Sequence, residues 1–369
     1  MNQLFRWDQM GLFLLALAAG ILPFAVPEVC AAALREGLAL CSGPLLLSLF
    51  PFLVVSRLLI QCPESDLLAL PFRLAAWGIG IRTPCAARVL CIGFLGGFAP
   101  AASAAAQAVR TGQLTAEEAD ALLPACICSG PSFVVLTVGQ SLLGSAELGV
   151  LLFAAQITAN YLTAALLNRF AGVHSVKQRP AAPAFPAPPR LDEILADAAI
   201  TYCKLCGFIL FFRMLAAGAG ALLPAGAGTL CAILLEVCSG CDLASRTGRW
   251  GSLLCCAALS VQGLSVLLQV RTICPPEMTL RPLYRARMLH LPLSLALFYL
   301  LLPGGEADVF STLPARVLLM RRVPPDCALL VFAGCCMAAC TLRSGIRQVE
   351  QKQMARNAGG CCINSKTLL

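Results

Sequence analysis

Charged side chains are scarce in this sequence. Only 12% of its 369 residues are Asp, Glu, Lys or Arg, roughly half of what a soluble globular domain carries. Histidine is rarer still, at two residues, His174 and His290. We find no phosphate-binding glycine loop, no Ser-His or Cys-His pair and no carboxylates or histidines at metal-ligand spacing. These absences argue against a soluble domain and against an enzyme, and we expect no cofactor and no metal.

Apolar residues, by contrast, make up 59% of the chain, and its mean hydropathy is +0.81. They fall in long runs separated by short basic or proline-rich pieces. Because lipid cannot bond backbone polar groups, such runs must be helices or barrel strands, and they are too uniformly apolar for alternating barrel strands. We therefore expect an all-α, polytopic membrane helical bundle in the cell membrane, with about seven to nine transmembrane or re-entrant helices.

The net charge of +8 could indicate nucleic-acid binding, and the 21 cysteines could indicate redox or metal chemistry. The positions of these residues in the sequence argue against both functions. The basic residues are spread through loops and the tail, which indicates topology signals and no nucleic-acid partner. Most cysteines lie inside apolar runs, as Cys255 and Cys256 do, where packing of a small side chain is the simplest role. Cys203 and Cys206 form a C-x-x-C, for which packing is again preferred to a redox or metal function.

The order of the runs divides the chain into six parts. They are N-terminal spans with an interfacial helix (1–85), a first repeat (86–170), a Pro-rich basic linker (171–190), a second repeat (191–303), a C-terminal span (304–341) and a disordered basic tail (342–369). Full spans are expected at residues 9–26, 43–61, 147–168, 198–223, 288–303 and 325–341, and an interfacial amphipathic helix at 65–81. Thr115 and Glu118 have the spacing of a capping box, which predicts a short helix after them.

Three of the apolar runs are interrupted. The first interrupted stretch, Gly93–Pro100, holds three glycines and a proline. The other two interruptions are Ser129–Ser132 (Ser-Gly-Pro-Ser) and Gln262–Ser265 (Gln-Gly-Leu-Ser). Glycine and proline both weaken a helix at such points. Each half also carries an Arg-Thr-Gly tripeptide, beginning at Arg110 and at Arg246, and each tripeptide is preceded by a glycine-broken apolar segment. Weak internal symmetry with broken segments in matching positions is typical of a transporter with a central binding site.

Glu236 is the only acidic residue deep inside an apolar run. A charge there is costly in lipid, so it should face the bundle interior as a ligand, cation or proton site. The alternative is that the segment ends early and Glu236 lies at the membrane interface. A single Gly/Pro break is best explained as a packing kink, whereas two in matching positions favour a site. Gln156 and Asn160, one turn apart, are expected to bond across helices. The candidate solute-binding residues are Gly97, Pro100, Ser129, Gly130, Pro131, Ser132, Glu236, Ser239, Gly240, Gln262, Gly263 and Ser265.

Several of these stretches resemble a known family. They read GFLGGFAPAA from Gly93, RTGQLTAEEA from Arg110, CSGPSF from Cys128, LEVCSG from Leu235 and LSVQGLSV from Leu259. In this order they are similar to the nucleoside-recognition or Gate domain, and more narrowly to the sporulation integral membrane proteins of the YlbJ type. The chain departs from that family in having Cys-Ile-Cys where its members tend to have paired asparagines before Ser-Gly-Pro.

The resemblance implies an integral membrane protein of sporulation, built from two Gate-like repeats. By analogy with related transporters, it implies a solute-binding or transport role at the broken helices between the repeats. The alternative is a non-transporting assembly or scaffold factor for spore envelope formation. The expected partners are the lipid bilayer, a small solute, and either further copies of the chain or other sporulation membrane proteins.

Overall fold

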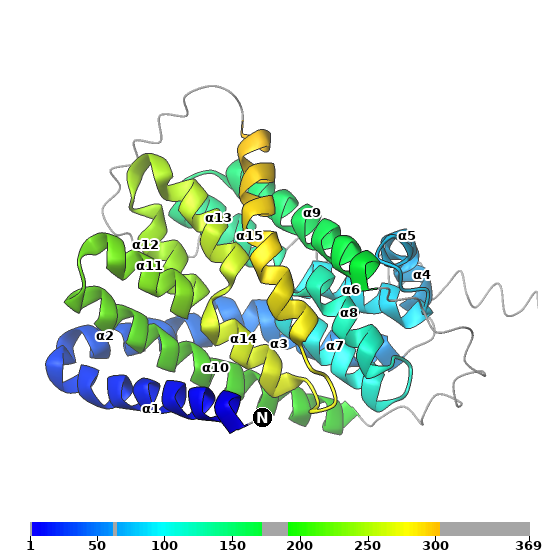
Figure 1. The fold of residues 1–369 in the computed structure, drawn as a ribbon, viewed down its shortest axis with the longest axis horizontal. Coiled ribbons are helices and arrows are strands. Elements are labelled where there is room, and N and C mark those ends of the chain that lie inside the picture. The colour runs from blue at the N-terminus through cyan, green and yellow to red at the C-terminus, as the bar shows by residue number, and fades with distance from the viewer. Residues whose placement is uncertain (1, 62–64, 172–190, 303–369) are drawn as a thin grey trace, which may run out of the picture.

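A computed structural model describes residues 2–61, 65–171 and 191–302 (Figure 1). All regular secondary structure in these ranges is helical, which confirms the all-α prediction. The linker from residue 172 onward, the expected span at 325–341 and the basic tail lie outside the described residues.

Four stretches of the described chain are long and apolar enough to cross a membrane: Pro27–Leu47, Ala146–Ala171, Leu191–Leu222 and Gly248–Ile273. The second and third are the continuous helices α9 (Ala146–Ala171) and α10 (Leu191–Leu222), as expected from sequence. Only 33% of the most apolar window of α10 is buried, so apolar side chains such as Ile200 and Leu222 face outward. A helix that stays apolar on its exposed faces suits a lipid environment.

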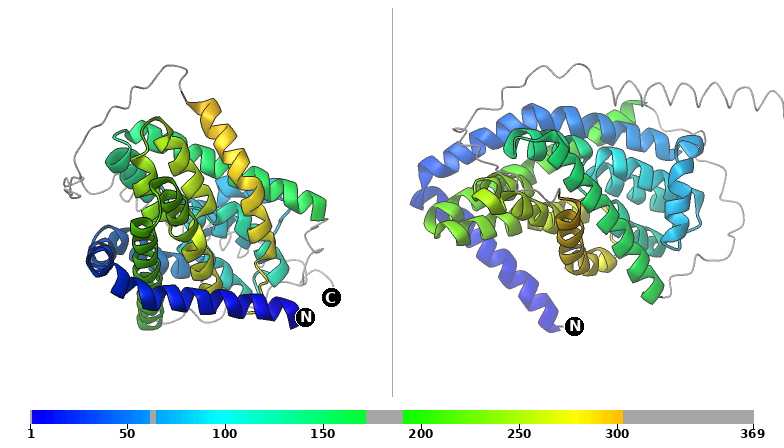
Figure 2. Two further views of the ribbon diagram at one scale, coloured as in Figure 1. Left: turned by 60° about the vertical axis from the view of Figure 1, so that its left-hand side comes forward. Right: turned by 90° about the horizontal axis from the view of Figure 1, so that it is seen from above.

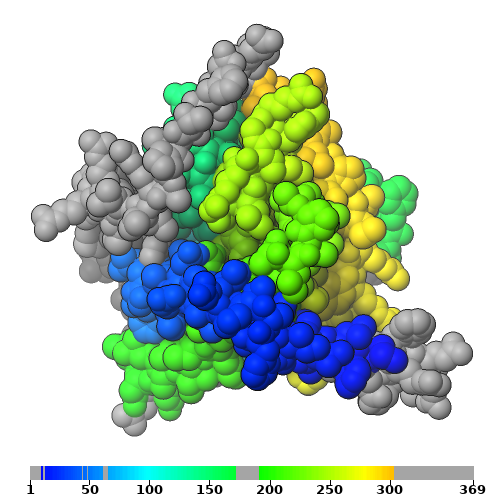
Figure 3. Space-filling view, turned by 90° about the vertical axis from the view of Figure 1, so that its left-hand side faces the viewer, coloured from blue at the N-terminus to red at the C-terminus, as the bar shows by residue number. Residues whose placement is uncertain are grey.

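The N-terminal region differs from its prediction. Helices α1 (Asn2–Ala25) and α3 (Pro44–Gln61) occupy the two expected spans, but the apolar part of each is short, at Phe13–Ala25 and Leu49–Ile60. The membrane-length stretch instead runs through α2 (Pro27–Ser42) into α3, where no span was expected. Both α1 and α2 pack against α10. Figure 2 shows α1 along one edge of the bundle, and Figure 3 shows these first helices (blue) against the second half (green).

Two short helices, α4 (Ser65–Leu68) and α5 (Leu70–Gly78), occupy the segment expected to be an interfacial helix. They pack on α6 and leave Trp77 exposed. The predicted capping box is confirmed at the start of α8 (Ala116–Cys126). The hydroxyl of Thr115 accepts the N–H of Glu118, and the carboxylate of Glu118 accepts the N–H of Thr115, each at 3.0 Å.

The interrupted runs are broken helices. Helix α6 (Pro84–Gly96) is separated from α7 (Phe98–Arg110) by Gly97, whose φ is +80°. The short segment 127–130 separates α8 from the π-helix η1 (Ser132–Leu142). Helix α11 (Ala225–Leu235) gives way to α12 (Val237–Ser245) at the extended residue Glu236. Helix α13 (Gly251–Val261) gives way to α14 (Gly263–Ile273) at Gln262, which has a φ of 62°.

The two halves share one core. Helix α7 packs on α14, α12 packs on η1, and α9 packs on α15 (Arg281–Leu301). The largest hydrophobic cluster runs through the helices of both halves and includes Cys255 and Cys256, both fully buried, as the packing prediction requires. Cys203 and Cys206 lie on α10, the first exposed and the second half-buried. A short 3-10 helix, η2 (Gly248–Trp250), precedes α13.

Candidate functional site

The helix breaks pack against one another in pairs. A Cβ atom at Gly97 would lie 2.7 Å from the backbone nitrogen of Gly130, so the α6–α7 and α8–η1 breaks are in direct contact. A Cβ atom at Gly263 would lie 2.9 Å from the backbone nitrogen of Glu236, so the α11–α12 and α13–α14 breaks are in contact as well. Only glycine allows backbones to approach this closely while also adopting a positive φ.

The carbonyl of Ile127 joins the two pairs. This residue is the C-cap of α8, and its oxygen accepts from Gln262 Nε2 at 3.4 Å and from Asn160 Nδ2 at 3.5 Å. The guanidinium of Arg287 donates to the same oxygen and to the carbonyl of Ser260 at 3.4 Å. All four breaks therefore meet in one place. We call the set of Gly97, Ile127 to Gly130, Glu236, Gln262 and Gly263 the break cluster.

Glu236 lies inside this cluster and is only 2% exposed. Its carboxylate is the N-cap of α12: it accepts the N–H groups of Cys238 and Ser239 at 2.8 and 2.7 Å and the hydroxyl of Ser239 at 2.8 Å. The apolar run does break at this residue, yet the carboxylate is buried rather than placed at an exposed helix end. The positive end of the α12 dipole favours a negative charge there.

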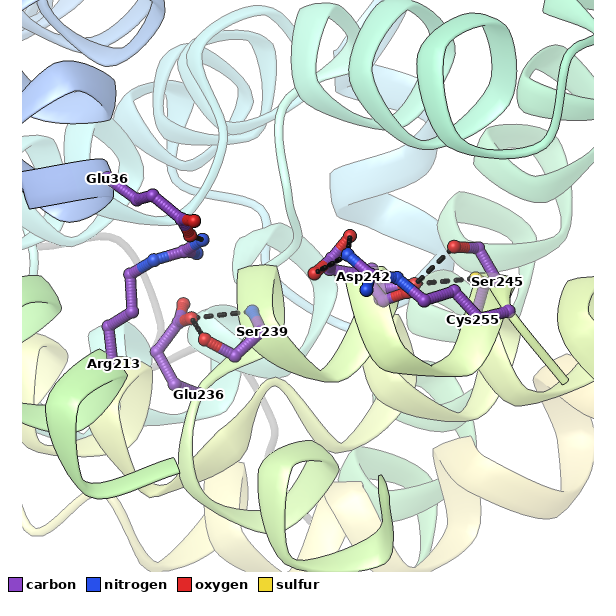
Figure 4. Close-up of polar contacts among 9 residues, drawn as sticks. Glu36, Arg213, Glu236, Ser239, Asp242, Ser245 and Cys255 are labelled. Atoms are coloured by element: carbon purple, nitrogen blue, oxygen red, sulfur yellow. Dashed lines mark hydrogen bonds and ion pairs between the residues drawn. The ribbon is translucent and has the colours of Figure 1, made fainter. Parts of the chain in front are cut away.

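An ion pair between a half-buried arginine and an exposed glutamate lies beside this carboxylate. Figure 4 shows Arg213 of α10 between Glu236 and Glu36 of α2. Arg213 Nη2 and Glu36 Oε2 are 2.7 Å apart, while Glu236 takes its hydrogen bonds from α12. Glu236 thus has helix donors on one side and a cation on the other, which accounts for a charge in an apolar interior.

Several buried polar atoms around the break cluster have no hydrogen-bond partner among the described residues. They are Oε1 of Gln262, Oδ1 of Asn160, Oγ1 of Thr163 and Nε of Arg287. Gln262, Asn160 and Thr163 are each 1% exposed, and Arg287 is 8% exposed. Asn160 and Thr163 lie three residues apart, on one face of α9. Because nearly all buried polar atoms in proteins are paired, this concentration indicates capacity for an additional bonding partner.

The twelve candidate residues from the sequence all lie at these breaks or within about one turn of them. Pro100 is buried in the first turn of α7, where a Cβ atom at Gly96 would approach its ring to 2.9 Å. Ser129 is buried beside Gly130, and Pro131 and Ser132 begin η1. Ser239 and Gly240 form the first turn of α12, and Ser265 lies in the first turn of α14. Gly240 is a packing residue, because a Cβ atom there would lie 2.8 Å from the Cα of Ile233.

Arg287 is the residue that sequence reasoning missed. The expected span at 288–303 leaves it just outside, but α15 already begins at Arg281 and carries Arg287 into the core. A signal was present, because the buried positions Leu283, Arg287, His290, Ser294 and Phe298 follow helical spacing. The prediction for Gln156 is confirmed: it bonds across helices to Cys256 O at 3.2 Å and Ser260 Oγ at 2.9 Å.

A scan against protein-family models finds no match for this chain, and no curated protein and no solved structure is significantly similar to it. The resemblance of the glycine-rich stretches to the Gate domain therefore stays a prediction. The chemistry of the break cluster rests on its own geometry.

Proposed function

We propose that this chain is a multi-pass cell-membrane protein of sporulation, of the YlbJ type, that binds a small polar solute at the break cluster and moves it across the bilayer. One observation supports a binding site at the break cluster. Four helix breaks, distant in sequence, meet around the Ile127 carbonyl, where several buried polar atoms have no hydrogen-bond partner within the part of the chain that the structure describes. Irregular backbone is tolerated at membrane depth where it is buried in protein or lines a cavity, and such breaks hold the substrate in many transporters.

We further propose that residues 86–170 and 191–303 are two Gate-like repeats. The order α6–break–α7, α8–break–η1, α9 is matched by α11–break–α12, α13–break–α14, α15. The contacts are reciprocal, as two-fold related units require: α7 meets α14 while α12 meets η1, and α8 meets α15 while α13 meets α9. The stretch Gly248–Ile273, which contains the broken helix α13–α14, is already one of the four membrane-length stretches. In this arrangement the other broken helices complete further membrane crossings, and the solute lies between the repeats.

The unpartnered atoms suggest the chemistry of the solute. Oε1 of Gln262 and Oδ1 of Asn160 are acceptors, and Nε of Arg287 is a donor. The carboxylate of Glu236 already accepts three hydrogen bonds from α12. This favours a neutral solute with N–H, O–H and carbonyl groups, such as a nucleoside, over a cation held by Glu236.

The test is the thermal stability of the full-length protein in detergent against nucleosides, small carboxylates and divalent metals. A solute that binds only the folded state stabilises it by about 2.7 kcal/mol at a hundred times its Kd. We expect a nucleoside-type solute to raise the unfolding temperature of the wild type, and the shift to disappear in Asn160→Ala. If no solute in the panel has any effect, the assembly-factor alternative is preferred. If the shift persists unchanged in Asn160→Ala, the site lies elsewhere.

A further inference from the structure

A second candidate site lies away from the break cluster, in a partly open cavity of about 180 Å³ lined by α3, α7, α10 and α14. Its walls include Ser103 of α7 and Gln269 of α14. Each of these residues is six positions beyond the break that starts its helix, at Gly97 and at Gly263. At 1.5 Å per residue, six positions place the cavity about 9 Å along the helices from the break cluster.

The cavity is positively charged. Three basic side chains line it, Arg57, Arg110 and Lys204, against one acidic residue, Asp197. Arg57 Nη1 lies 2.5 Å from Asp197 Oδ2, so this pair neutralises itself. Arg110 and Lys204 form no ion pair within the described residues, which leaves two positive charges at the cavity. Cations that line a cleft with low-dielectric walls attract an anion.

The inner wall is polar and incompletely bonded. Gln269 is 2% exposed, and its Nε2 donates one N–H to Ser265 Oγ at 2.8 Å, which leaves a second amide N–H as a donor. Its Oε1 has no partner among the described residues and can accept only from an O–H, such as that of a monoprotonated phosphate. Ser103 is 3% exposed, and its hydroxyl makes no hydrogen bond within the described part of the chain. Two exposed surface cations alone would not form a site. Here Arg110 and Lys204 share a cavity with Ser103 and Gln269, two buried polar side chains that can form further hydrogen bonds.

We infer that this cavity binds a phosphate group, with Arg110 and Lys204 as charged donors and Ser103 and Gln269 as the inner wall. Its volume holds about six water molecules at roughly 30 Å³ each, which suits a tetrahedral oxyanion with part of its hydration shell. Arginine and lysine are the usual protein partners of phosphate oxygens. The phosphate comes either from a small soluble anion or from a phospholipid headgroup, since the cavity lining includes Ile200, an exposed apolar side chain of α10.

The source is decided with two probes on the full-length protein in an uncharged detergent. Inorganic phosphate is titrated at constant ionic strength, with chloride as the compensating anion so that screening stays fixed. Phosphatidic acid is added to the same micelles in a parallel series. We expect a saturable rise in unfolding temperature with at least one probe, and the one that acts at lower concentration identifies the source.

Two double variants separate a site from general charge. Arg110→Gln with Lys204→Gln removes both unpaired cations, and loss of two charge-assisted contacts should weaken the Kd on the order of a hundredfold. Arg281→Gln with Arg285→Gln removes the same charge from exposed positions of α15 and should leave the Kd unchanged. Gln269→Glu places a carboxylate beside the two cations, and should give a folded protein without phosphate binding.

Equal weakening in both double variants would overturn the inference, as would the absence of any response to either probe. The site is independent of the proposed solute site. Asn160→Ala should therefore keep its phosphate response even where it loses its solute response, so failure of one proposal is distinguishable from failure of the other.

Discussion

Gly263 lies directly against the backbone of Glu236: a Cβ atom on the glycine would be 2.9 Å from the glutamate nitrogen. The same relationship holds between Gly97 and Gly130 in the first half of the chain. Each pair of broken helices thus crosses at its breaks, where one glycine lets the two backbones touch. This crossing brings polar backbone and side chains of four helix ends into one buried place, and it makes the glycines sensitive to substitution.

Gly263→Ala should destabilise the protein by more than about 2 kcal/mol, because alanine is strained at a positive φ and its Cβ meets backbone that cannot move aside. Gly112→Ala is the matched control. Gly112 has a φ of +70°, close to the +69° of Gly263, but nothing lies within 4 Å of its added Cβ. It should lose only about 1 kcal/mol. Unfolding in detergent compares the stability of the two variants. An equal loss of stability in both would show that the close approach of Gly263 to the Glu236 backbone does not contribute to the effect.

Glu236→Gln should lower the free energy of unfolding by about 1 kcal/mol, since one carboxylate oxygen that accepts from α12 is replaced by an amide NH2. Glu236→Ala should cost more, because it removes the cap entirely. Glu147→Gln is the control: Glu147 lies in the first turn of α9 but is exposed, and should change little. A Glu236→Gln protein with unchanged stability and no solute response would instead assign the carboxylate to the solute.

Arg287→Lys should destabilise the bundle by about 2 kcal/mol or more, because an ammonium cannot reproduce the two bonds of the guanidinium to Ile127 O and Ser260 O. These carbonyls lie at the ends of α8 and α13, so the substitution loosens the contact between the two halves. Arg285→Lys, two positions earlier on the exposed face of α15, should be neutral. Chemical denaturation of both variants measures the difference in stability. Similar denaturation midpoints would show that the hydrogen bonds of Arg287 do not stabilise the break cluster.

Asn160 and Asn168 offer a matched pair on α9. Asn168 Nδ2 donates to Ile79 O at 2.9 Å and Ala121 O at 3.1 Å, whereas Asn160 Nδ2 makes one long bond of 3.5 Å to Ile127 O. Asn168→Ala should therefore lower stability by about 1–3 kcal/mol and keep the solute response. Asn160→Ala should cost less stability and lose the solute response. Thermal unfolding with and without the solute distinguishes these outcomes, and the reverse pattern would move the site toward Asn168.

The sequence by itself determined what depends on neighbours within a turn or on composition. The apolar runs and few charges indicate helices that suit a membrane, because lipid leaves backbone groups no other partner. The interruptions at Gly97, Gly130 and Gly263 could be predicted because glycine and proline act on the local backbone. The capping box at Thr115 followed from the same local rules. Cross-helix bonding by Gln156 followed from the cost of leaving an amide unpaired.

The tertiary structure alone decided which of these features meet. Nothing local to Glu236 shows that its backbone lies against Gly263, and nothing local to Arg287 shows that it reaches Ile127, 160 positions away in the chain. The span through α2 was missed because its boundary with α3 depends on how both helices pack on α10. Contacts between distant segments depend on the shape and volume of a shared core, and these quantities are not local to any stretch of sequence.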